Sequence, residues 1–123
     1  MVKHCVLALA LVVLPATGAA AMPVSAFLAK ADALKKKGPL ALFSGDIKLL
    51  MNQVKADSAE LRAENKALET AGKRKHYCPP AKFAMDEDQI MLAMRQVPAA
   101  HRAHTSTKDA LRTYLARQHP CRS

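Results

Sequence analysis

The first 21 residues limit what the rest of the chain can fold into, because they form an apolar segment laid out like an export signal. Lys3 lies in a short leading segment, an unbroken apolar run extends from Val6 to Leu14, and small residues follow up to Ala21. This order is typical of a secretory signal peptide. A membrane-spanning helix needs about 20 apolar residues, and this run is shorter. We therefore predict a cleaved signal peptide over 1–21, no transmembrane anchor, and a periplasmic or secreted protein.

The cysteines are the second constraint on the fold. Of the three in the chain, Cys5 leaves with the signal, and the remaining segment 22–123 retains Cys78 and Cys121. An even pair in an oxidising compartment predicts a disulfide, whereas two buried, unpaired thiols would be the expectation for a cytosolic chain. We predict a single helical domain over 22–123, in which the bond closes a C-terminal unit, 78–121.

The apolar residues of 22–123 recur with helical spacing, and no segment shows the alternating β-branched residues that predict a strand. The predicted fold class is all-α, a small helical domain with one disulfide. About four helices are expected: from Ser25 to Lys37, over 46–71, from Asp86 to Val97, and from Ser106 to the final His119-Pro120-Cys121.

Capping residues set the expected ends of these helices. Ser25 is a candidate N-cap for the first helix, and a lysine run followed by Gly38 and a proline is a typical stop. Asp86 and Gln89 have the spacing of a capping box, and Ser106 is a candidate N-cap for the last helix.

The long helix over 46–71 carries a sparse, heptad-like apolar line. Its members are Ile47, Leu50, Val54, Leu61 and Leu68. We expect the first half of the helix to pack and the second half, rich in Ala, Glu and Lys, to be solvated. The line allows pairing with a second copy to give a homodimer, and the alternative is a single projecting helix. The apolar patch 40–43 just before it is expected to be a turn or connector that plugs the core.

The loop between the second and third helices, over 73–84, is expected to be fixed by its prolines and the disulfide. Many of the apolar residues are alanines and the chain has no Trp, so the core is modest for a small domain. The Cys78–Cys121 bond is therefore the expected main covalent support, and the unit that it closes is the expected rigid part.

The sequence gives little support for catalysis. It contains no metalloprotease, hydrolase, Walker A or dinucleotide-binding motif, so we do not expect an enzyme or a cofactor. His101 and His104 are spaced like ligands on one helical face, but they follow Pro98 in a polar connector, which favours exposed histidines. The acids 86–88 are expected to interact with a helix dipole, and we expect no metal site.

The net charge of +9 concentrates in two basic patches. They consist of Lys35, Lys36 and Lys37, and of Lys73, Arg74 and Lys75. Solvated helix ends explain both patches; the alternatives are contact with an acidic protein partner, with lipid headgroups or with cell-wall polymer. Aromatic residues are not interleaved with the patches, and an exported protein seldom meets nucleic acid, so nucleic-acid binding is not expected.

The segment from Cys78 to Cys121 has Cys78 and Pro80 at its start, Leu111 and Leu115 in the last helix, and Pro120-Cys121 at its end. In these features it resembles the C-terminal unit of the Rap/Tai-type immunity proteins. The family's further N-terminal cysteine pair has no counterpart between Met22 and Tyr77. The resemblance implies an exported helical protein of bacteria with type VI secretion systems, one that caps envelope toxins of the amidase class, often as a dimer.

Two functions are therefore expected. The first is a periplasmic protein-binding module, immunity-like, whose disulfide-closed unit docks as a rigid platform with little loss of conformational entropy. The second is a structural, envelope-associated basic protein that binds anionic lipid or cell-wall polymer.

Overall fold

The computed structural model describes residues 21–122, and the predicted signal peptide lies outside this range except for Ala21. Four α-helices and two short 3-10 helices follow one another in the order α1 (Val24–Lys37), η1 (Gly38–Phe43), α2 (Gly45–Thr70), α3 (Glu87–Arg95), η2 (Ala99–His101) and α4 (Thr107–Gln118). The one pairing of strand type within 21–122 is an isolated bridge between Pro23 and Ser106. The all-α prediction with one disulfide is confirmed.

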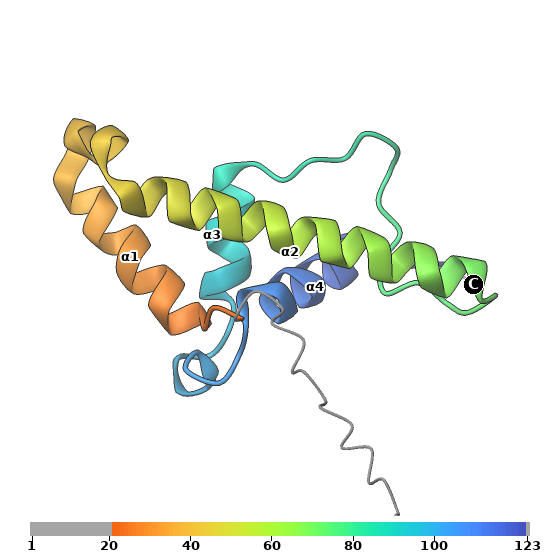
Figure 1. The fold of residues 1–123 in the computed structure, drawn as a ribbon. Coiled ribbons are helices and arrows are strands. Elements are labelled where there is room, and N and C mark those ends of the chain that lie inside the picture. Colours follow the sequence, from red (N-terminus) through yellow and green to blue (C-terminus); the bar gives the residue numbers. More distant parts are fainter. Residues whose placement is uncertain (1–20, 123) are drawn as a thin grey trace, which may run out of the picture.

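Helices α1 and α2 form a hairpin with η1 at its turn, and α3 and α4 pack beside it (Figure 1). Helix α2 packs against both α1 and α4, and α3 packs against α4 and α1. The fully buried side chains at their junction include Val24, Leu61, Met94 and Leu111. The core therefore lies where all four α-helices meet.

The local stop and cap signals of three helices act as expected. Gly38 ends α1 at a positive φ of 56°, a conformation that glycine adopts at little cost. Asp86 and Gln89 form the capping box of α3, with hydrogen bonds of 2.8 and 3.0 Å between the side chain of each and the backbone N–H of the other. The Ser106 hydroxyl accepts a hydrogen bond from the Asp109 N–H at the start of α4.

The prediction of Ser25 as the first N-cap is wrong. Helix α1 begins one residue earlier, at Val24, and Pro23 occupies the cap position. The free N–H groups of its first turn are satisfied by another part of the chain: the Val24 N–H donates to the Thr105 carbonyl, and the Ser25 N–H to the Arg102 carbonyl. A side-chain cap is unnecessary because these backbone acceptors satisfy the first donors.

The prediction that the second half of α2 is solvated holds for most of its residues but is wrong for the face that meets the core. Leu61 is fully buried, and Asn65 is buried one turn later. Leu50 is buried too, and Ile47 and Val54 pack against the same core. The heptad-like line thus faces the protein's own core from Ile47 to Leu61, so pairing of two copies through it would require opening that core.

Candidate functional site

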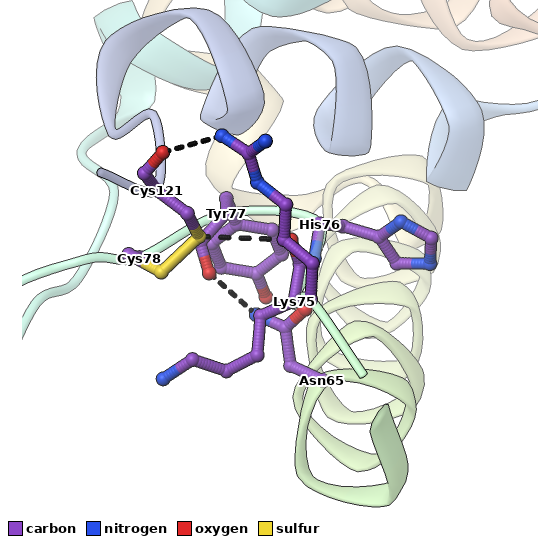
Figure 2. Close-up of a disulfide and its surroundings, with 7 residues drawn as sticks. Asn65, Lys75, His76, Tyr77, Cys78 and Cys121 are labelled. Atoms are coloured by element: carbon purple, nitrogen blue, oxygen red, sulfur yellow. Dashed lines mark hydrogen bonds between the residues drawn. A yellow bond between two sulfur atoms is a disulfide. The ribbon is translucent and has the colours of Figure 1, made fainter. Parts of the chain in front are cut away.

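The disulfide closes the C-terminal unit as predicted (Figure 2). Cys78 and Cys121 are 43 residues apart in sequence and 4.9 Å apart between Cα atoms. The Cys78 N–H donates to the His119 carbonyl at 2.8 Å, so a backbone hydrogen bond lies beside the covalent bond. The end of α4 is therefore fastened to the chain that leaves α2.

Asn65 holds the chain on its other side. Its amide donates to the Tyr77 carbonyl and its carbonyl accepts from the His76 N–H, both at 2.9 Å. This clamp places the Tyr77 ring in the core, and burial raises the pKa of its phenol, an effect that Arg62 partly offsets. The segment before Cys78 is thus fixed by a buried amide as well as by the disulfide.

The basic patch of Lys73, Arg74 and Lys75 lies at this closed end of the molecule. The Arg74 guanidinium donates to the Cys121 carbonyl at 2.6 Å, and the Lys75 carbonyl oxygen lies 3.6 Å from the Cys121 sulfur (Figure 2). Arg74 therefore has a structural partner within the chain, while the Lys73 side chain is exposed.

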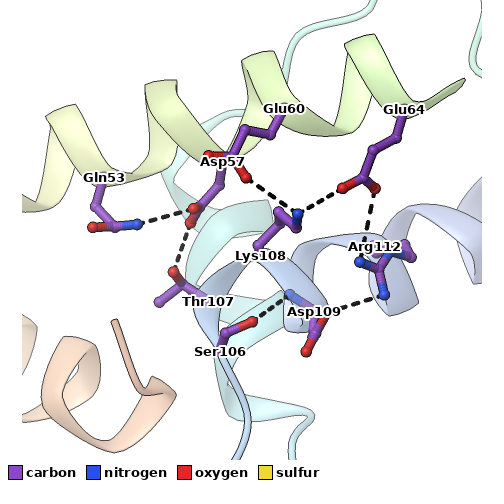
Figure 3. A network of polar contacts seen from close by, with 9 residues as sticks. All are labelled: Gln53, Asp57, Glu60, Glu64, Ser106, Thr107, Lys108, Asp109 and Arg112. Carbon is purple, nitrogen blue, oxygen red and sulfur yellow. Dashed lines mark hydrogen bonds and ion pairs between the residues drawn. The ribbon is translucent and has the colours of Figure 1, made fainter. Parts of the chain in front are cut away.

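A polar network joins α2 to α4 (Figure 3). The Thr107 hydroxyl donates to one oxygen of Asp57 at 2.6 Å, and the Gln53 amide donates to the other oxygen at 2.9 Å. Lys108 lies between Glu64 at 2.6 Å and Glu60 at 3.1 Å, and its hydrogen bonds to these two carboxylates raise the pKa of its ammonium group.

Arg112 extends the network by pairing with Asp109 at 3.0 Å and with Glu64 at 3.8 Å. The carboxylates of this interface thus already have hydrogen-bonding or cationic partners within the chain. Such an arrangement holds the two helices against each other.

The histidines do not converge on a metal site. Among the residues that the structure describes, no three His, Cys, Asp or Glu side chains are grouped so that they could hold a metal ion. The His119 ring packs edge-on against Phe83, with 4.5 Å between ring centroids. His101 and His104 are exposed around η2, where the His104 N–H donates to the His101 carbonyl.

A shallow hollow of about 210 Å³ lies beside α3 and α4. Small apolar side chains such as Ala93 and Val97 line it together with the polar groups of His101 and Arg117. None of the described residues that line it is acidic.

The apolar patch before α2 differs most from the sequence-based expectation. Leu40, Leu42 and Phe43 do form a helical turn, η1, but their exposed fractions are 70%, 74% and 89%, so they do not plug the core. The turn lies at the end of the α1–α2 hairpin, away from α4 (Figure 1). We call these three residues the tip. The position of the tip between Gly38-Pro39 and Ser44-Gly45 could have indicated its exposure. So short a connection between two helices cannot fold back over the helices that it joins.

Lysines surround the tip in sequence and in space. Lys35, Lys36 and Lys37 form the last turn of α1, immediately before η1, and Lys48 lies in the first turn of α2; all four are exposed. We call these four residues the lysine collar. The basic patch at the other end of α2 does not join them, so the two patches of the sequence are separate surfaces (Figure 1).

Comparison of the chain with protein-family models, with curated proteins and with solved structures gives no match. Within residues 21–122, none of the helices combines the length and the apolar character needed to cross a bilayer.

Proposed function

We propose that this chain is an exported, non-catalytic binding protein of the cell envelope, and that it docks through the tip. The observation that carries the proposal is the exposure of Leu40, Leu42 and Phe43, three large apolar side chains in one turn. Exposed apolar clusters bordered by polar residues mark interaction surfaces. The paired carboxylates of the α2–α4 interface support a binding role over a catalytic one.

Cell fractionation tests this proposal. The full chain is expressed in a bacterial host with a periplasm, and its distribution between the envelope and the periplasmic fluid is measured after osmotic shock. We expect wild type to remain with the envelope and the variant L40S/L42S/F43S to be released several-fold more. L92S is the control, because Leu92 is a large apolar residue on α3, 47% exposed and outside the tip. Identical distributions of wild type and the tip variant would overturn the proposal.

A second candidate function is the capping of an envelope toxin. It is favoured by the resemblance of 78–121 to immunity proteins and by the rigidity expected of a unit held by both the disulfide and Asn65. A rigid surface loses little conformational entropy on docking. Its test is protection of a host against a toxin encoded beside this gene, with unchanged killing in the presence of the protein as the contrary result.

A further inference from the structure

We propose that the occupant of the tip is an anionic lipid bilayer: the three apolar side chains enter the acyl boundary while the lysine collar contacts the headgroups. This inference rests on the proposed function, since it names what the tip binds. Amphipathic surface elements bind membranes in this way, through apolar area on one side and lysine or arginine at the level of the headgroups.

The tip has the chemistry of a membrane-inserting element. Leu40, Leu42 and Phe43 carry no polar atom in their side chains, and all three are exposed in η1, the turn at the end of the α1–α2 hairpin (Figure 1). Leu49 and Met51, 45% and 55% exposed, lie in the first two turns of α2 and add exposed apolar area next to η1. The backbone of η1 forms a helical turn, so some of its N–H and C=O groups are already hydrogen-bonded to each other. This lowers the cost of moving the turn into lipid, where unpaired backbone groups are unfavourable.

The charge around the tip is complementary to an anionic surface. No acidic residue lies between Asp32 and Asp46, and each of these two acids is paired within the chain: Asp32 with Arg95 and Asp46 with Lys30, both at 3.4 Å. The lysine collar therefore presents positive charge that neighbouring carboxylates do not cancel. A basic residue near an anionic leaflet strengthens binding by roughly fivefold, so four of them account for a factor on the order of hundreds.

The residue types favour lipid over a protein partner. Protein interfaces are enriched in Arg, Met and aromatic residues and depleted of Lys. The hairpin over 24–51 exposes Phe43 and Met51, but it contains no Arg, Tyr or Trp and carries five Lys. A second copy is also a poor occupant, because tip-to-tip contact would bring two lysine collars together and like charges repel. Helix α2 has 26 residues and is about 39 Å long. A docked tip would therefore hold the disulfide end away from the bilayer.

Vesicle flotation tests the inference, using protein purified from the periplasm of a host that expresses the full chain. The vesicles are phosphatidylcholine alone, or phosphatidylcholine with phosphatidylglycerol, at low and at high salt. We expect binding only to the anionic vesicles, with loss at about 1 M salt, where the Debye length falls to about 3 Å. F43S should weaken binding roughly tenfold to a hundredfold, while L92S should not.

The decisive comparison is between two variants of equal net charge. K35Q/K36Q/K37Q/K48Q removes the lysine collar, and K55Q/K66Q/K73Q/K75Q removes four lysines elsewhere. We expect at least a hundredfold loss for the first variant and less than tenfold for the second; equal losses would overturn the inference, because net charge alone would then explain binding. Absence of flotation, with the tip variant still released from cell envelopes, would overturn the lipid assignment and leave a protein partner for the proposed function. Failure in both assays would overturn both proposals.

Discussion

Thr107 offers the sharpest test of how this fold is held together. Its side chain is fully buried at the start of α4, and its hydroxyl donates at 2.6 Å to Asp57, which is only 5% exposed. Thr107→Val preserves the shape of the side chain and removes the donor. One carboxylate oxygen of Asp57 then loses its hydrogen bond from α4, while the Gln53 amide still donates to the other oxygen.

The expected cost is about 2–3 kcal/mol of unfolding free energy. Hydrogen bonds to charged groups contribute about 1.5–3 kcal/mol, and leaving a buried carboxylate oxygen without its donor puts the loss near the top of that range. Against a total stability of about 5–15 kcal/mol, such a loss lowers the midpoint of thermal unfolding by roughly 10 °C or more. Thr107→Ser is the matched control, because it keeps the hydroxyl and loses only a methyl group, worth about 1 kcal/mol.

Urea unfolding followed by circular dichroism at 222 nm, with the disulfide intact, measures these differences. A double-mutant cycle with Asp57→Ala separates the hydrogen bond from other effects of each change. We expect Asp57→Ala to cost at least 1 kcal/mol less in the Thr107→Val background than in wild type. The reasoning fails if Thr107→Val and Thr107→Ser have equal stability within about 0.5 kcal/mol, or if the costs of Asp57→Ala and Thr107→Val simply add.

Two further predictions concern the disulfide and alkaline pH. The variant C78S/C121S should lose about 4 kcal/mol of unfolding free energy, which is the chain-entropy value for a separation of 43 residues. A urea midpoint equal to that of wild type would contradict this prediction. The folded-state pKa values of Tyr77 and Lys108 lie above their ordinary 10.0 and 10.5, so the stabilisation linked to both is complete below pH 10 and declines as the pH rises through the folded values. Urea midpoints should therefore fall from pH 9 to 12, and they should fall less steeply in Y77F. The phenolate absorbance of Tyr77 should appear at a higher pH than that of a free tyrosine. A urea midpoint that does not change with pH would contradict this prediction.

The sequence predicted helix ends reliably where the capping groups lie close together in the chain. The capping box of Asp86 and Gln89 and the stop at Gly38 depend on residues within a few positions of each other, so the sequence contains all the groups involved. The disulfide could also be predicted, because a chain that is expected to be exported and to lose Cys5 with its signal keeps two cysteines, which leave one pairing.

The errors arose where a group far along the chain decides the local structure. Ser25 is not a cap because carbonyls about 80 residues later accept the first N–H groups of α1. One face of the second half of α2 is buried because Leu61 packs in the core and Asn65 binds the backbone of 76–77. Asp57, at the middle of the helix, is buried where it binds Thr107. A single sequence contains no signal for these pairings, since polar residues in a helix are ordinarily exposed. The tip was misplaced for the opposite reason, because an apolar run was assumed to be buried.

The distribution of phenylalanine shows why the tip calls for a partner. The chain has three Phe and no Trp. Phe27 is buried in the core, Phe83 packs against the core and His119, and Phe43 is 89% exposed. Burying a Phe stabilises a fold by about 1.5–3 kcal/mol, a large gain for a small domain. Phe43 does not contribute this gain, because it lies exposed at the end of the hairpin beside two exposed leucines and four lysines. Its apolar area is therefore available for contact with a partner. The disulfide end of α2 supports the structure, and our proposal assigns binding to the tip at its other end.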